Sequence, residues 1–281
     1  MDALNPDLED REDLNEIDEF PQFNSARLIY GEGTSKRDWL QWDGLNQLKR
    51  MDLESEFPKD SRIIILSPHP DDEILGCAGL IQGLDLLGRE VVIVAVTNGT
   101  QSHPYSKKYS AEELNTIRPN ESRRALKSLH LTQNIQYLSF ELEDGKLLEQ
   151  VKTLEQKLHQ LINKQLSKKH NILVTTYEKD GHPDHECLGR CVREYAEREQ
   201  LKCYQVLIWA WHWAKPMDPQ IAWESARRLD LNQQFLDHKA SAIKCFESQT
   251  EDDLTTQQPA ILPTHVIDRI LMPFEVYIHV E

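Results

Sequence analysis

The sequence is poor in cysteine, and its cysteines form no motif. Five occur among 281 residues, an odd number, and no two of them have C-x-x-C spacing. They are Cys77, Cys187, Cys191, Cys203 and Cys245. These spacings argue against a disulfide framework and against a thiolate zinc site. We therefore expect a protein of a reducing compartment.

Positive charge is also scarce. Lysine and arginine number 32 against 47 aspartates and glutamates, which gives a formal net charge of -15. A general binder of nucleic acid or anionic membranes needs a cationic surface that displaces counterions, so neither partner is expected. No apolar run is long enough for a membrane span, and the acidic start lacks the pattern of a signal peptide. We expect a soluble, cytoplasmic protein that acts on a small molecule.

The first 26 residues differ in composition from the rest. They are rich in aspartate and glutamate and poor in apolar residues, so burial cannot offset the entropy cost of ordering them. We expect residues 1–26 to form an acidic, mobile leader. Residues 27–281 are numerous enough to bury one large core, and we expect them to form a single domain.

Strand-like and helix-like segments alternate along this domain. The expected strands are 63–66, 91–96, 135–140, 172–176 and 203–209, and the expected helices are a short one near 39–48, then 73–87, 120–129, 147–166 and 186–198. Because Pro119 has no backbone N–H, we expect any helix over 111–117 to be separate or kinked there. The alternation predicts an α/β fold that is Rossmann-like and doubly wound, with a mostly parallel sheet and helices on both faces.

A histidine and three acidic residues directly follow the first of these strands, in the order His69-Pro70-Asp71-Asp72-Glu73. Proline disfavours helix at the residue before it, so His69 stays in the loop while the acidic residues start a helix. Adjacent carboxylates then point in different directions, and one can bind a metal while the other faces the attacking water. We assign His69 and Asp72 to the metal and Asp71 to the general base.

A second cluster, His182-Pro183-Asp184-His185, follows the strand expected at 172–176. Ligands of doubly wound sheets bind beyond the carboxyl ends of the strands, where both clusters fall. His185 is the natural third ligand, and two histidines with one carboxylate suit zinc and tolerate Fe²⁺ or Co²⁺. His182 could polarise the scissile carbonyl or protonate the leaving amine, and Asp184 could orient its ring.

These motifs resemble those of the LmbE-like de-N-acetylases, also called the PIG-L family, in a bacterial branch. The His-Pro-Asp-Asp-Glu and His-Pro-Asp-His motifs are both intact, and between them Thr97-Asn98-Gly99, Arg118-x-x-Glu121 and Asp144-Gly145-Lys146-Leu147 keep the family's order. The similarity covers residues 62–190. It implies zinc held by His69, Asp72 and His185, with Asp71 as base and His182 stabilising the oxyanion.

The resemblance also implies candidate substrate contacts. Arg118 and Asp144 are candidates for binding sugar hydroxyls, and Asn98 stands where many relatives have aspartate, which keeps an acceptor and loses a charge. His212 is a further candidate, because it lies in the aromatic group Trp209 to Trp213. Indoles stack on sugar rings, but if 203–209 is a strand that continues, Trp209, Trp211 and Trp213 share one face and simply pack a helix.

The predicted function is metal-dependent removal of an N-acetyl group from an N-acetylated sugar or sugar conjugate. A metal-dependent phosphoester hydrolase is a second hypothesis, although such enzymes commonly use two metals and arginine clusters. A catalytically idle carbohydrate-binding protein is a third, although the base, the ligands and the second histidine are all retained.

Overall fold

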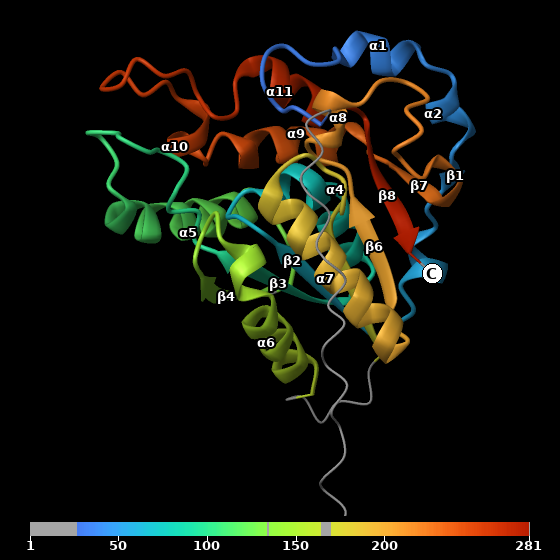
Figure 1. Cartoon of the computed structure of the whole chain (residues 1–281). Coiled ribbons are helices and arrows are strands. Elements are labelled where there is room, and N and C mark those ends of the chain that lie inside the picture. The colour runs from blue at the N-terminus through green and yellow to red at the C-terminus, as the bar shows by residue number, and fades with distance from the viewer. Residues whose placement is uncertain (1–26, 134, 164–169, 281) are drawn as a thin grey trace, which may run out of the picture.

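One mixed sheet organises the domain. The computed structural model describes residues 27–133, 135–163 and 170–280, so the predicted acidic leader lies outside the described residues. Within them, eight strands form a single sheet in the order β1-β7-β8-β6-β5-β2-β3-β4 (Figure 1). Their bounds are β1 Lys49–Arg50, β2 Ser61–Ser67, β3 Glu90–Thr97, β4 Gln136–Leu142, β5 His170–Thr176, β6 Lys202–Val206, β7 Ala226–Asp230 and β8 Phe274–Val280.

Helices connect the parallel strands β2 to β6, as the sequence predicted. The helices are α1 Lys36–Gln41, α2 Gly44–Gln47, α3 Leu53–Glu56, α4 Asp72–Leu86, α5 Ala111–Lys127, α6 Val151–Asn163, α7 Pro183–Glu199, α8 Ala210–Trp213, α9 Gln233–Ile243, α10 Glu247–Thr250 and α11 Thr264–Ile270, with 3₁₀ turns at Leu147–Gln150 and Trp223–Ser225. The expectation that a helix over 111–117 is separate was wrong. A capping box between Ser110 and Glu113 starts α5 at Ala111, well before the expected start at 120, and Pro119 lies inside the helix.

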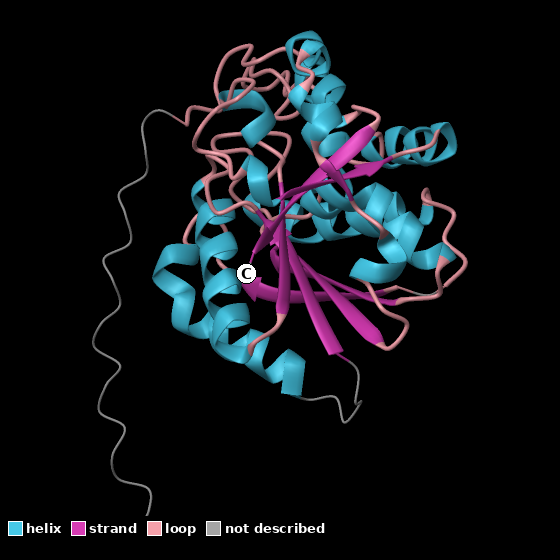
Figure 2. Ribbon diagram, turned by 90° about the vertical axis from the view of Figure 1, so that its right-hand side faces the viewer, coloured by secondary structure: helices cyan, strands magenta, loops and turns pink. Residues whose placement is uncertain are grey.

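Alternate residues of β2 enter two separate cores, which confirms the doubly wound fold. Ile63 and Ile65 belong to the core beneath α4 and α9, whereas Ile64 and Leu66 belong to the core beneath α6 and α7. Figure 2 shows helices on both sides of the sheet. Because both faces are covered, the strands read as continuous apolar runs rather than alternating ones.

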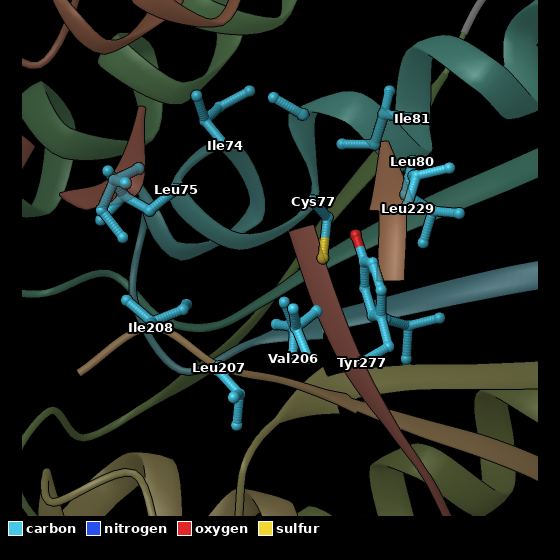
Figure 3. Packing of buried hydrophobic residues seen from close by; sticks show 14 of the residues in the cluster. Ile74, Leu75, Cys77, Leu80, Ile81, Val206, Leu207, Ile208, Leu229 and Tyr277 are labelled. Carbon is cyan, nitrogen blue, oxygen red and sulfur yellow. The ribbon is translucent and has the colours of Figure 1, made fainter. Parts of the chain in front are cut away.

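Helix α4 is buried on nearly every side. Its residues Ile74, Leu80 and Ile81 are fully buried, and Figure 3 shows them in one cluster with Val206 of β6, Leu229 of β7 and Tyr277 of β8. The Cys77 thiol and the Tyr277 hydroxyl point toward each other in this core (Figure 3). The helix that begins at Asp72 is therefore anchored along its whole length, which fixes the position of its first turn.

The C-terminal part of the sheet differs from the sequence prediction. Strand β6 ends at Val206, and the segment after it turns into helix α8, so Trp209, Trp211 and Trp213 do not alternate along a strand. Trp211 instead packs edge-on against Trp39, with ring centroids 5.0 Å apart. Strands β7 and β8 were not predicted, and β8 runs antiparallel to both β6 and β7. Among the described residues, no helix combines the length and apolarity that crossing a membrane requires.

The strand order reverses between β2 and β5, which are parallel neighbours. From β2 the chain proceeds to β3 and β4 on one side, and later to β5 and β6 on the other. Crevices at such reversals are where doubly wound folds bind ligands. The two predicted motifs follow these two strands, so the topology brings them to one place.

Candidate active site

The corner between β2 and α4 has an unusual backbone. Asp71 has φ 139° and ψ -33°, a combination that L-residues rarely adopt. Its N–H donates to Glu73 Oε2 at 3.1 Å. Strain of this kind persists only where surrounding contacts hold it, and it is concentrated at functional sites.

The three predicted metal ligands lie together. Asp72 Oδ2 is 3.3 Å from His69 Nδ1 and 3.2 Å from His185 Nε2. Asp72 also accepts the His69 backbone N–H at 3.0 Å, which ties the loop to the first turn of α4. All three residues are buried. One carboxylate oxygen thus faces two imidazole nitrogens that come from different strand ends.

Asp180, which the sequence reading missed, holds His185 in place. Its Oδ2 lies 2.8 Å from His185 Nδ1. The same fully buried carboxylate accepts backbone N–H groups from Ile208, Trp209 and Ala210 at 2.8 to 3.1 Å. Once Nδ1 donates to Asp180, the Nε2 lone pair is directed at Asp72. The sequence did offer one signal for this role, because Asp180 is an acidic loop residue five positions before the predicted ligand His185.

The donor set fits a divalent cation. His185 Nε2 is buried and has no hydrogen-bond partner among the described residues, although Asp72 Oδ2 is only 3.2 Å away. Burial alone would lower the pKa of His185, but the negative charges of Asp72 and Asp180 outweigh it and raise the pKa to about 9. A potential that holds a proton on this ring also attracts a metal ion. Two histidines and a carboxylate are a zinc ligand set.

A second arrangement shares two of these ligands. The imidazole nitrogens of His69, His182 and His185 lie within 4.8 Å of one another. A three-histidine set is also used by zinc. Asp72 Oδ2 is nevertheless only 3.2 to 3.3 Å from both His69 and His185, and we take it as the carboxylate ligand.

Arg118 contacts the predicted base. Its guanidinium donates to Asp71 Oδ2 at 3.0 Å and to the carbonyls of Pro70 and Gly99 at 2.9 Å. Burial raises the pKa of Asp71 to about 7, although the Arg118 charge opposes this shift. Arg118 was predicted to bind substrate hydroxyls, but it is buried and its terminal nitrogens are engaged by this corner. These contacts hold the Asp71 carboxylate, and the substrate role of Arg118 stays a prediction.

His182 caps α7 and has one nitrogen occupied. Its Nδ1 accepts the backbone N–H of Asp184 at 3.2 Å, which leaves the proton of the neutral ring on Nε2. Burial lowers the pKa of His182 to about 3, and the neighbouring rings of His69 and His185 add to the effect. The backbone N–H of Asp184 contacts this ring, and the predicted orienting role of its carboxylate stays a prediction.

The Asp184 carboxylate serves His69 instead. It accepts N–H groups from Gly145 at 2.8 Å and Leu147 at 3.3 Å, and its Oδ2 lies 3.2 Å from His69 Nε2. Asp144 Oδ1 is 3.1 Å from the same nitrogen. Asp144 was predicted to bind substrate, and the structure places it against His69, a predicted metal ligand.

The other two predicted substrate residues have different surroundings. Asn98 Nδ2 donates to Asn115 Oδ1 and its Oδ1 accepts from Ser139, both at 2.9 Å, and its substrate role stays a prediction. His212 is buried beneath the N-terminal segment, with Nε2 3.1 Å from the Tyr30 carbonyl and Nδ1 2.7 Å from Arg269. Both ring nitrogens are engaged within the fold, and its role in binding substrate stays a prediction.

Residues 64–196 match the sequence profile of the PIG-L family, described as GlcNAc-PI de-N-acetylase. This segment contains both histidine motifs and Asp180. The chain is therefore similar to the PIG-L family over this segment. The resemblance stated from the motifs is therefore confirmed. No curated protein sequence matches the chain.

Solved structures of PIG-L-like deacetylases share the fold. The zinc-inhibited form of teicoplanin deacetylase Orf2 superposes with a TM-score of 0.58 at 15% identity, covering 78% of this chain and 97% of that one. N,N'-diacetylchitobiose deacetylase from Pyrococcus horikoshii gives 0.52 at 22%, covering 73% and 76%. The 4-carboxy-2-hydroxymuconate hydratase GalB from Pseudomonas putida gives 0.52 at 15%, covering 79% and 96%. One fold thus carries a hydrolase and a hydratase, so the chemistry must be argued from the site residues.

Proposed function

We propose that this chain is a divalent-metal hydrolase that removes the acetyl group from an N-acetylated sugar or sugar conjugate. The observation that carries the proposal is the meeting of His69, Asp72 and His185 beside the Asp71 carboxylate. Metal ligands and a separate base, delivered to one point, are the parts that metal-assisted amide hydrolysis needs.

Zinc is the ion that the donor set favours, with Fe²⁺ or Co²⁺ as alternatives. A bound ion supplies a Lewis acid that polarises the acetyl carbonyl and acidifies water. His69, Asp72 and His185 would hold it. The carboxylates around the two rings supply the negative potential that a cation requires.

Asp71 has the role of general base. It accepts a proton from the attacking water while the water oxygen bonds to the acetyl carbon. Its carboxylate is buried, and its Oδ2 accepts a hydrogen bond from Arg118. Asp71 has a positive φ whereas Asp72 begins helix α4, and we assign the neighbouring carboxylates different tasks.

His182 has the role of hydrogen-bond donor to the developing oxyanion. Its Nδ1 accepts the Asp184 N–H, so the proton available to a substrate is on Nε2. Donors held in advance toward the oxyanion stabilise it without reorganisation. Collapse of the tetrahedral carbon breaks the C–N bond, the amine takes up a proton, and acetate and a free amine are the products.

The substrate class is supported by the family description and by the neighbours. The family profile is described as a GlcNAc-PI de-N-acetylase, and two of the neighbours are named for teicoplanin and for diacetylchitobiose. Each of these descriptions names a deacetylase, and GlcNAc-PI and diacetylchitobiose both contain N-acetylated sugar. We propose a glycoconjugate of small-molecule size as the partner of this chain.

Acetate release tests this proposal. Zinc-loaded protein is incubated with N-acetylated monosaccharides, disaccharides and glycosides, and Asp71→Asn serves as the matched control. The proposal predicts stoichiometric acetate and free amine that the control does not produce. Release of phosphate from a generic ester, with no acetate from any sugar, would replace it by the phosphoesterase hypothesis.

A further inference from the structure

The turn formed by residues 144–147, between β4 and the 3₁₀ turn Leu147–Gln150, contacts the metal-ligand cluster although it contains no ligand motif. We infer that this turn is a positioning element for the metal ligand His69, and that Asp144 and Asp184 together fix which ring nitrogen faces the metal. The inference rests on the proposed function for the identity of the ligands. It assigns Asp144 to His69 rather than to the substrate.

Two carboxylates meet one ring nitrogen. Asp144 Oδ1 is 3.1 Å and Asp184 Oδ2 is 3.2 Å from His69 Nε2. Both residues are buried, with 6% and 2% of their surface exposed. They reach His69 from different parts of the chain, because Asp144 follows β4 and Asp184 lies in the first turn of α7.

The turn holds both carboxylates. It supplies Asp144 itself, and its Gly145 and Leu147 N–H groups bind the Asp184 carboxylate at 2.8 and 3.3 Å. The second oxygen of Asp144 accepts the Gln101 backbone N–H at 2.6 Å. Each carboxylate is thus fixed by backbone donors on one side and by His69 on the other.

This geometry determines the orientation of the His69 ring. Carboxylates only accept hydrogen bonds, so Nε2 must carry a proton and donate it to them. The lone pair of the ring is then on Nδ1, which lies 3.3 Å from Asp72 on the side of His185. Ligand histidines generally donate their other N–H to a carboxylate in this way. Without the two acceptors, no contact would favour the tautomer that is protonated on Nε2 and leaves the Nδ1 lone pair available to a metal.

The same contacts engage both oxygens of Asp144 within the fold. One oxygen faces His69 and the other accepts from Gln101. The Gln101 contact also ties the loop after β3 to this cluster, so that loop shares a rigid support with His69.

Metal affinity tests the inference without any substrate. Zinc dissociation constants are measured by chelator competition for the wild type, Asp144→Asn, Asp184→Asn and the double variant, and the visible spectrum of the Co²⁺-loaded proteins is recorded. An asparagine amide can place an N–H against Nε2, which opposes the required tautomer. We expect each single variant to lose about 10- to 100-fold in zinc affinity, the double variant to lose more, and the Co²⁺ spectrum to change.

Asp85→Asn is the matched control. Asp85 is also 6% exposed, and it binds the backbone N–H groups of Thr132 and Gln133 through its carboxylate. It touches no histidine of the site, so we expect its zinc affinity and Co²⁺ spectrum to equal those of the wild type.

Two outcomes would overturn the inference. Unchanged zinc affinity and spectrum in both single variants and in the double variant would show that the carboxylates do not position His69. A raised KM in Asp144→Asn with wild-type zinc affinity would show that Asp144 binds the substrate rather than positioning His69. Failure of the proposed function looks different, because zinc binding would then depend on both carboxylates while no acylated sugar is hydrolysed.

Discussion

The two histidine motifs share the sequence His-Pro-Asp, but their residues have different contacts and different proposed roles. In both, a histidine precedes Pro-Asp at the start of a helix that follows a parallel strand. In the first motif the residue after proline, Asp71, has a strained backbone and is the proposed base. In the second it is Asp184, whose carboxylate supports His69 and whose N–H fixes His182. Position in a motif therefore specifies a place in space, and the surrounding contacts specify the role.

The histidines differ in the same manner. His69 has carboxylates on both ring nitrogens, whereas His182 accepts a backbone N–H on one nitrogen. The pKa of His69 is raised well above its usual range, because Asp144, Asp184 and Asp72 outweigh the effect of burial. The pKa of His182 is lowered by burial. The anionic environment of His69 suits a ligand of a metal cation, and the environment of His182 suits a neutral hydrogen-bond donor.

The largest effect should separate the two histidines of the second motif. His185→Ala removes a proposed ligand, and we expect zinc affinity to fall by more than about 100-fold, beyond the loss of an outer partner, and turnover to vanish. His182→Ala should keep zinc and lose turnover. Chelator competition and acetate release measure both. Equal zinc loss in the two variants would favour the three-histidine ligand set instead.

A second substitution tests the base. Asp71→Asn keeps the size of the side chain and its contact with Arg118 while removing the proton acceptor. We expect kcat to fall by about 10² to 10⁴, the range of general base catalysis, with zinc content unchanged. Metal analysis and initial rates give the two readouts. Wild-type kcat in this variant would remove Asp71 from the mechanism.

A third substitution displaces Arg118, which contacts the proposed base Asp71. In Gly99→Ala the new Cβ would lie 2.0 Å from Arg118 Nη1, at φ 66°. We expect kcat to fall and the free energy of unfolding to drop by about 1 to 3 kcal/mol. Gly31→Ala is the control, because it has φ 77° and no atom within 4 Å. Loss of stability without loss of kcat would mean that Arg118 does not position Asp71.

The smallest effect concerns the ion pair between Arg27 and Glu186, the residue that follows the second motif. Arg27 binds Glu186 through two nitrogens, at 2.8 and 3.0 Å. Because both side chains are only partly buried, we expect Arg27→Ala to lower the free energy of unfolding by about 1 kcal/mol. Denaturant titration measures this loss, and zinc affinity should stay unchanged. A large loss of zinc would show that the N-terminal segment helps to shape the metal site.

Much of the fold followed from local patterns. The strands from β2 to β6 are short apolar runs between helical repeats, and each was predicted to within a few residues, apart from the far end of β6. The end of β6 was misplaced because Trp209 to Trp213 look apolar enough for a strand, whereas the Asp180 carboxylate binds the N–H groups of residues 208–210 and starts a helix there. The antiparallel β8 depends on pairing with β6 and β7, which no local pattern encodes.

The site was predictable to the extent that strand ends determine it. Proximity of His69, Asp72 and His185 followed from two motifs at neighbouring strand ends. The contacts of Asp180, Asp144 and Arg118 could not be predicted in this way. Each depends on the three-dimensional position of a segment that is distant in sequence from its partner or lies in a loop. Charge and hydrogen-bond needs identify such residues only once their neighbours are known.

The most direct test is a zinc titration of metal-free protein during acetate release from an N-acetylated glycoside. The account predicts that the rate rises in proportion to added zinc and levels off at about one equivalent, the number that one His69, Asp72 and His185 set binds. Asp71→Asn should take up the same zinc with no release. A rate that stays at zero with zinc, Fe²⁺ and Co²⁺ across the substrate panel would contradict the account.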